Sequence, residues 1–259
     1  MSQSSEPIFN VPAVVLTILA VLGGIHAIRV FLLTPDQDLE MLLLFAFISA
    51  RYDTALLLEG ALPGGFAAQI WTFVTYAFIH ADIAHLGMNT VWFVPFGTVV
   101  ARRFGATRFL AFFTVAAAGG AAAHLAAHPG EVLPVIGASA AVSGMMAASM
   151  RFAFQPRGPL AVWQANGAGA RHVPAAPLFS ALRDPRILAF LLVWFGINIL
   201  FGLGSLPIAG AGQTVAWEAH IGGFLAGLLL FSAFDPVPKH MAFDGDSRPD
   251  GDGTRSGAS

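Results

Sequence analysis

Residues 135–148 read V-I-G-A-S-A-A-V-S-G-M-M-A-A and place Ser139 near the start of an apolar helix built of small residues. A polar group at membrane depth is a functional candidate, because its burial in lipid is costly. Two other apolar stretches carry polar side chains that could join Ser139: residues 80–89 (H-A-D-I-A-H-L-G-M-N) and residues 219–227 (A-H-I-G-G-F-L-A-G). Together the three stretches predict a reactive site inside a helical membrane protein.

The composition of the whole chain supports a membrane location. Of its 259 residues, 56% are hydrophobic and 11% are charged, whereas a soluble domain carries about 25% charged residues. The 23 phenylalanines, with many Ala, Leu and Gly, favour helices in lipid over a barrel of alternating strands. The absence of cysteine excludes disulfides, thiolate metal sites and a cysteine nucleophile. A net charge of -2 without a basic cluster predicts no nucleic-acid partner.

The apolar runs predict an all-α membrane protein with six spans, since a span needs about 20 apolar residues. The expected spans are approximately residues 11–33, 82–100, 109–127, 137–151, 186–203 and 215–234. The predicted organisation is a short cytoplasmic N-terminus, a six-helix membrane domain and a disordered cytoplasmic tail, over residues 1–10, 11–234 and 235–259.

Two connections are long enough to have structure or a role of their own. Residues 34–69 read as a long first loop with short helices at the membrane interface, flanked by Trp71 and Tyr76 as members of an interfacial aromatic belt. Residues 156–185 are rich in Gly, Pro and Ala without an apolar period, and they read as a loop.

Positive charge predicts the orientation in the membrane. The loops on one side carry Arg102, Arg103, Arg108, Arg151, Arg157, Arg171, Arg183 and Arg186. The positive-inside rule then places both termini in the cytoplasm and the three polar stretches in the exterior half of the bilayer. The lack of an organelle-targeting segment favours a bacterial inner membrane.

A nucleophile and a base are predicted from two small-residue helix faces. Gly223 and Gly227 follow His220 at helical spacing, and such residues allow a second helix to approach closely. A matching face of small residues on the other helix contains Ser139, Ser143 and Ala147, with Gly137 and Gly144 seven residues apart. Contact between the faces would bring His220 within hydrogen-bonding reach of the Ser139 hydroxyl, which is the geometry of nucleophile activation.

Hydrogen-bond donors for an oxyanion are expected nearby. His85 and Asn89 are four residues apart and therefore face the same way on a helix. The backbone N–H of Ser139, at a helix N-terminus, is a third donor. His80 points elsewhere and is interpreted as a supporting residue. The pattern H-x-D-x-x-H formed by His80, Asp82 and His85 lacks zinc-site spacing, so neither a metal nor another cofactor is expected.

Five motifs in order resemble the rhomboid family of intramembrane serine proteases. They are W-x-x-x-T-Y-A-F-I-H (71–80), H-L-G-M-N (85–89), Gly97 with Gly105, G-A-S-A (137–140) and A-H-I-G-G-x-x-x-G (219–227). The resemblance implies a six-helix bundle in which Ser139 is the nucleophile and His220 the base, in a dyad without aspartate. It implies an oxyanion hole of His85, Asn89 and the Ser139 amide, supported by His80, Gly137, Gly223 and Gly227. It also implies cleavage of single-span transmembrane substrates near the exterior face.

Four positions depart from the family pattern. Ala140 stands where the family has glycine, and Ser143 where an aromatic residue stacks on the histidine. Thr72 and Ala101 replace an arginine and a glutamate, so the first loop must be anchored differently. Two other functions remain open: a catalytically inactive rhomboid-like protein that binds transmembrane helices, and a small transporter with His85, Asn89 and His220 along its path. The transporter lacks support from repeated halves or paired broken helices.

Overall fold

Helices form all the regular structure that the computed structural model describes, which covers residues 11–58, 60, 62–155, 158, 173–202 and 216–238. Within these residues, the only extended pairing is an isolated antiparallel bridge between Phe47 and Val135. The predicted all-α class is therefore confirmed. The predicted residues 1–10 and most of the predicted tail lie outside the described residues.

Four of the described helices are long and apolar enough to cross a membrane. They are α1 (Ala13–Phe31), α5 (Ile83–Phe104), α6 (Ala106–Ala127) and α10 (Trp217–Phe234). The two other predicted spans correspond to the shorter helix α7 (Ser139–Met150) and to α9 (Pro185–Gly202), whose apolar part, Pro185–Leu200, is shorter than the four spans. The chain is a multi-pass helical membrane protein, and the count of six spans stays a prediction.

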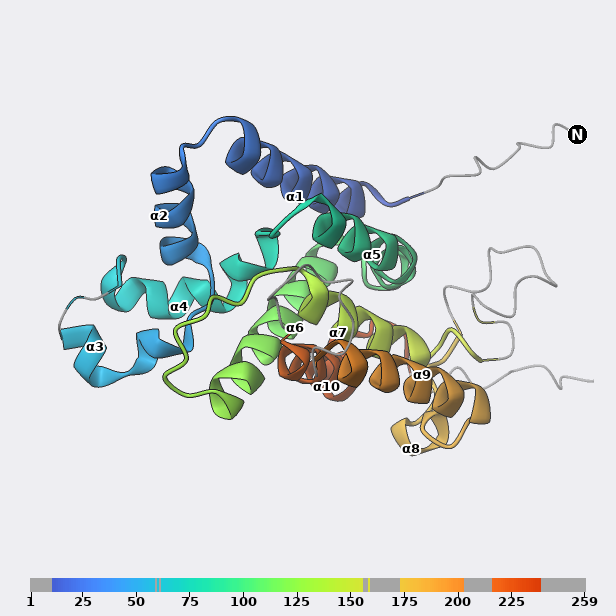
Figure 1. Ribbon diagram of the computed structural model, residues 1–259. Helices are drawn as coiled ribbons and strands as arrows, with labels where there is room; N and C mark the ends of the chain where they lie inside the picture. Colours follow the sequence, from blue (N-terminus) through green and yellow to red (C-terminus); the bar gives the residue numbers. More distant parts are fainter. Residues whose placement is uncertain are drawn as a thin grey trace, which may run out of the picture.

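Short helices occupy most of the connection between α1 and α5. They are α2 (Pro35–Phe45), η1 (Ser49–Tyr52), α3 (Thr54–Leu58), α4 (Gly65–Thr75) and η2 (Tyr76–Phe78). Helix α2 begins at Pro35 because Thr34 and Gln37 form a capping box around its first turn. Figure 1 shows α2, α3 and α4 gathered on one flank of the molecule, beside the bundle of long helices. Their position at a membrane interface stays a prediction.

A buried arginine anchors this connection in place of the charges lost at Thr72 and Ala101. The guanidinium of Arg51 donates to the carbonyl of Pro63 at 2.6 Å and to the carbonyl of Leu43. The backbone carbonyl of Arg51 in turn accepts the Gln69 side-chain amide at 3.0 Å. The two carbonyls compensate part of the cost of burying the charge, while the Nε atom of Arg51 has no hydrogen-bond partner.

Tyr76 is not part of an interfacial aromatic belt, contrary to the prediction. Its side chain is buried, and its hydroxyl donates to the carbonyl of Ala117 on α6 at 2.8 Å. Trp71 is half-buried and donates its indole N–H to the carbonyl of Leu44 on α2. Both aromatic residues connect elements within the protein.

Helix α7 is the centre of the bundle. All its residues from Ala140 to Met150 are buried, and it packs against α5, α6 and α10 (Figure 1). A helix that is apolar on every side is expected in such a position.

The contact between α7 and α10 is made by backbones. A Cβ atom added at Gly223 or Gly227 would overlap the backbone of Ala140 or of Gly144. The predicted helix pair is thus in contact, but the face of α7 that meets these two glycines contains Ala140 and Gly144. Gly144 belongs to the predicted face of small residues, whereas Ala140 lies on the adjoining side of the helix, one residue after Ser139.

The first residues of α7 pack beside α6 at some distance along the helix axis from the end of α6. The Ala140 methyl group occupies the space that a side chain at Gly120 would fill. Gly120 is seven residues before the last residue of α6, which corresponds to about 10 Å along the helix axis. The hydroxyl of Ser139 is therefore recessed within the bundle.

The opposite end of the bundle is fixed by ion pairs and hydrogen bonds. Arg103 on α5 forms a buried ion pair with Asp235 at 2.8 Å, so the first residue of the predicted disordered tail is in fact held against the bundle. Arg151 donates to the carbonyl of Ala176 at 2.9 Å. In the described part of the predicted loop 156–185, the chain forms the helical turn α8 (Leu178–Ala181), which was not predicted from the sequence.

Candidate active site

Ser139 and His220 are brought together from two helix starts. Ser139 is the first residue of α7 and His220 is the fourth residue of α10. The His220 Nε2 atom lies 2.7 Å from the Ser139 Oγ atom. The close approach of the two helices at Gly223 makes this distance possible, because any larger residue there would separate their backbones.

A third side chain, Asn198 on α9, completes the arrangement and was missed in the sequence analysis. Its Oδ1 atom is hydrogen-bonded to His220 Nδ1. Its Nδ2 atom donates to the carbonyl of Trp194 at 2.8 Å, which fixes the amide so that Oδ1 faces the imidazole. An acceptor at Nδ1 requires the proton there and leaves the lone pair at Nε2, facing the serine hydroxyl. The available signal was a lone amide in an otherwise apolar helix.

Gly137 shapes the approach to the serine. Its φ of 114° lies where L-residues with a side chain are strained. A Cβ atom at this position would also lie 2.7 Å from His85 Nε2. The N–H of Gly137 donates to the carbonyl of Tyr76 at 3.0 Å, which holds the turn before α7 in place.

His85 directs an N–H group toward this turn. Its Nδ1 atom accepts a long hydrogen bond of 3.4 Å from the N–H of Ala81, so Nε2 carries the proton in the neutral ring. Asp82 caps α5 by accepting the N–H of His85 at 2.8 Å. Asp82 therefore acts as a helix cap beside His85.

Asn89 lies one helical turn after His85 on α5 and is buried. Its Nδ2 atom donates to the carbonyl of His85 at 3.0 Å and would lie 3.8 Å from a Cβ on Gly137. His85 and Asn89 thus share one side of α5, beside the turn that precedes Ser139, as the spacing predicts.

His80 supports the same turn from beneath. The side chain is fully buried, and its Nε2 atom accepts the N–H of Ala138 at 3.4 Å. Its backbone carbonyl accepts from the Arg29 guanidinium of α1 at 2.6 Å. Burial, with smaller contributions from His85, His26 and Arg29, lowers the pKa of His80 to about 3. The imidazole is therefore neutral and able to accept a hydrogen bond at physiological pH.

The structure accommodates the two departures from the family pattern that lie next to the serine, Ala140 and Ser143. The Ala140 methyl group is accommodated against Gly120 of α6. The Ser143 hydroxyl donates to the carbonyl of Ser139 at 2.8 Å and so remains within α7. In place of a stacked aromatic ring, Asn198 Oδ1 holds the imidazole of His220 by accepting from Nδ1–H, at the ring edge opposite Ser139.

Comparison with known proteins identifies the family of the chain. Residues 67–234 match the rhomboid domain family. Rhomboid protease GluP of Bacillus subtilis (strain 168) is 28% identical over 173 residues, which are 67% of this chain and 27% of the relative. Rhomboid-related protein 3 of Homo sapiens is 36% identical over 84 residues, which are 32% of this chain and 20% of the relative. The chain thus matches about a quarter or less of the length of these relatives.

The matched region begins within α4 and ends with the last residue of α10. It contains Ser139 and His220 together with the whole of α5, α6 and α7, and it covers more than half of the chain. The chain therefore belongs to the rhomboid family.

Proposed function

We propose that this protein is an intramembrane serine endopeptidase that cleaves transmembrane segments of single-span membrane proteins by a Ser–His dyad. The observation that carries the proposal is the 2.7 Å separation of His220 Nε2 and Ser139 Oγ. The orientation of the imidazole by Asn198 adds to it, because the unprotonated nitrogen then faces the hydroxyl.

The reaction proceeds through an acyl-enzyme. Ser139 Oγ attacks the carbonyl carbon of the scissile peptide bond while its proton moves to His220 Nε2. His220 returns this proton to the leaving amine as the C–N bond breaks. A water molecule, deprotonated by His220, then hydrolyses the ester and restores the serine hydroxyl. Asn198 holds the Nδ1–H group throughout and keeps the ring in place.

The developing oxyanion is stabilised at the start of α7. The Nε2–H group of His85, the Nδ2 amide of Asn89 and the backbone N–H of Ser139 are the donors. Gly137 leaves room beside His85 for the carbonyl oxygen of the substrate. Loss of one such donor typically costs about 10²–10³ in rate.

The recessed position of Ser139 determines which conformation the substrate must adopt. A peptide bond within a transmembrane helix is internally hydrogen-bonded, so the substrate must unwind locally to reach Ser139. Arginines at the adjoining ends of α5 and α6, and others between α7 and α9, support termini in the cytoplasm and a dyad in the exterior half of the membrane. We infer a bacterial inner membrane as the location.

Labelling by a fluorophosphonate probe tests the proposal directly. The detergent-solubilised parent should be labelled, and Ser139→Ala and His220→Ala should not be. Ser149→Ala is the matched control, because Ser149 lies on the same helix and its hydroxyl donates to the carbonyl of Met146. The parent and Ser149→Ala should also cleave a single-span substrate, and Ser139→Ala and His220→Ala should not.

Each other outcome identifies an alternative. A well-folded parent that is neither labelled nor active would be a rhomboid-like protein that binds transmembrane helices without cutting them. Flux across liposomes that depends on His220 would identify a transporter.

A further inference from the structure

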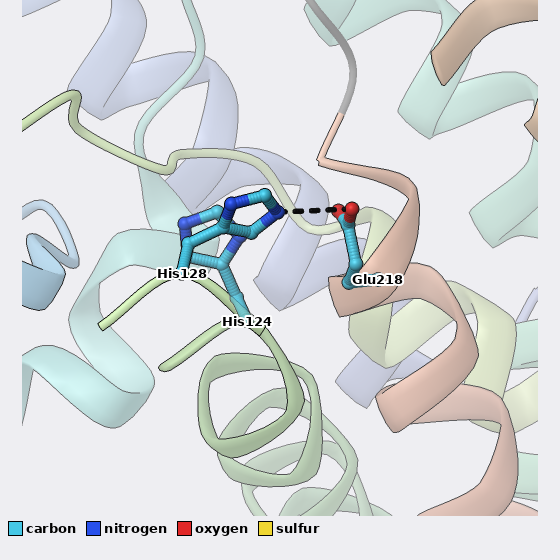
Figure 2. Close-up of side chains that lie close together, drawn as sticks. All are labelled: His124, His128 and Glu218. Atoms are coloured by element: carbon cyan, nitrogen blue, oxygen red, sulfur yellow. Dashed lines mark hydrogen bonds and ion pairs between the residues drawn. The ribbon is translucent and has the colours of Figure 1, made fainter. Parts of the chain in front are cut away.

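A second polar cluster lies at the end of the bundle where α6 stops and α10 begins. His124 is in the last turn of α6, His128 caps that helix, and Glu218 is the second residue of α10. Figure 2 shows the two imidazoles on one helix end with the Glu218 carboxylate facing them across the gap. One ligand atom from each of the three side chains lies within 4.8 Å of the others. The serine dyad makes no use of this cluster.

The contacts within the cluster leave the buried imidazole of His124 without a hydrogen-bond partner. His128 Nε2 lies 3.0 Å from Glu218 Oε1, and His128 Nδ1 lies 3.5 Å from Glu131 Oε2. His124 Nε2 lies 3.6 Å from the same Glu131 oxygen, beyond hydrogen-bonding distance. His124 is only 5% exposed, yet neither of its ring nitrogens has a hydrogen-bond partner. If the cluster were only an ion pair between His128 and the two carboxylates, the buried ring nitrogens of His124 would still lack a hydrogen-bond partner.

The chemistry of the cluster fits a cation. A divalent ion would balance the negative charge of the two carboxylates, and its binding requires both imidazoles in their neutral form. Imidazole nitrogen with carboxylate oxygen is a donor set suited to zinc and neighbouring transition metals. Two histidines four residues apart face the same direction on a helix, which is a geometry used in zinc sites.

We propose that His124, His128 and Glu218 bind a divalent transition-metal ion of the zinc class, with the Glu131 carboxylate as a neighbouring hydrogen-bond acceptor for His128 Nδ1. The ion would join the end of α6 to the start of α10. Glu218 is two residues before His220, so the bound ion would fix the part of the chain that carries the proposed base. No metal site was predicted from the sequence, where only His80, Asp82 and His85 resembled a zinc pattern. This inference does not depend on Ser139 being a nucleophile.

Cobalt binding provides the test, because Co²⁺ replaces Zn²⁺ in such sites and absorbs visible light. The full chain in detergent is treated with a chelator and titrated with Co²⁺, followed by displacement with Zn²⁺. The parent should bind one ion per chain, and its thermal unfolding temperature should rise. Glu218→Gln and His124→Asn should weaken binding at least about 10-fold, the lower limit for loss of even an outer-shell partner. Glu40→Gln, on the exposed face of α2, is the control and should bind as the parent does.

Chelator-treated variants must unfold in a single transition, as the chelator-treated parent does, which shows that the substitutions do not prevent folding. Ser139→Ala should bind Co²⁺ with unchanged affinity, which separates this site from the dyad. Absence of binding to the folded parent would overturn the proposal. So would equal affinity in the parent, Glu218→Gln and His124→Asn. Binding that is lost in His85→Ala but kept in Glu218→Gln would place the ion at other histidines and would also overturn it.

Discussion

The imidazole of His220 lies between a donor and an acceptor that assign it one tautomer. Asn198 accepts at Nδ1 and is itself fixed by Trp194, while the Ser139 hydroxyl lies at Nε2. An asparagine orients the ring without adding the negative charge that a carboxylate would supply. The contribution of Asn198 to the cleavage rate should therefore be smaller than that of Ser139 or His220, and Asn198 should act only by orienting His220.

Asn198→Leu should lower kcat by about fivefold. Leucine is similar in size but cannot accept a hydrogen bond, and the loss of about 1 kcal/mol of hydrogen-bond energy converts to that factor. The measurement is the cleavage rate of a single-span substrate at saturation, with KM followed separately. Ile199→Leu, on an exposed part of the same helix, is the control.

A double variant distinguishes positioning from general destabilisation. If Asn198 acts through the imidazole, Asn198→Leu should not lower further the residual, slow cleavage rate of His220→Ala, measured over long incubation. A further fivefold loss in that background would show that Asn198 contributes through the fold.

Gly137→Ala should abolish most of the activity at a moderate cost in stability. The positive φ costs an L-residue about 1–2 kcal/mol, and the new Cβ would displace the His85 donor, for which a loss of about 100-fold is expected. Gly130→Ala is the matched control, since Gly130 has a φ of 77° but open space around it. Comparable unfolding temperatures with different cleavage rates would agree with this role. Equal activity of the two variants would contradict it.

At the level of elements, the approach of α7 to α10 sets the geometry of the dyad. Gly223→Ala should push the helices apart, because its Cβ overlaps the backbone of Ala140. Overpacking of this kind typically costs about 1–3 kcal/mol. Gly196→Ala in α9 meets no atom within 4 Å, and it should be neutral or stabilising by up to about 1 kcal/mol.

Unfolding of both glycine variants by an added denaturing detergent measures this difference, and cleavage assays should show activity lost only in Gly223→Ala. If Gly223→Ala unfolded at the same point as the parent and kept its activity, the backbone contact would not be what positions His220.

The sequence predicted which helices are in contact more accurately than it predicted which side of each helix forms the contact. The small residues around Ser139 and His220 identified the pair in contact, because close approach of helices requires small residues. On α7 the contact through Gly144 was expected and the contact through Ala140 was not, since small residues stand on every side of that helix and a buried helix has no polar face to orient it.

Asn198 and the cluster of His124, His128 and Glu218 depend on contacts between residues far apart in the chain. A lone amide in α9 and two histidines at helical spacing were visible in the sequence. Their partners on α10 were not, because no local pattern links α9 or α6 to the start of α10.

For the whole molecule, polar contacts between distant segments hold both ends of an apolar bundle together. The carbonyl of His80 accepts from Arg29 of α1, and its side chain accepts from Ala138 before α7. Arg103 and Asp235 join α5 to the end of α10 at the other end. Lipid offers no hydrogen bonds, so each such contact is specific and its loss is costly.

His80 should make the stability of the whole fold depend on pH. Burial first, and then its neighbours His85, His26 and Arg29, lower the pKa of His80 to about 3, whereas the unfolded chain binds this proton at about 6.5. Below about pH 6.5 the unfolded state therefore holds a proton that the folded state excludes. Stability should fall as the pH falls, by up to about 1.4 kcal/mol per pH unit from this residue.

His80→Gln removes the titrating group but keeps an acceptor for the N–H of Ala138. The variant should be somewhat less stable than the parent at pH 7.5, yet lose less stability between pH 7 and 5. Detergent-induced unfolding at a series of pH values measures the two slopes, with Glu40→Gln as a control for the loss of an exposed group. Parallel curves for the parent and His80→Gln would mean that His80 takes up its proton in the folded protein, and that the turn before Ser139 is held by other contacts.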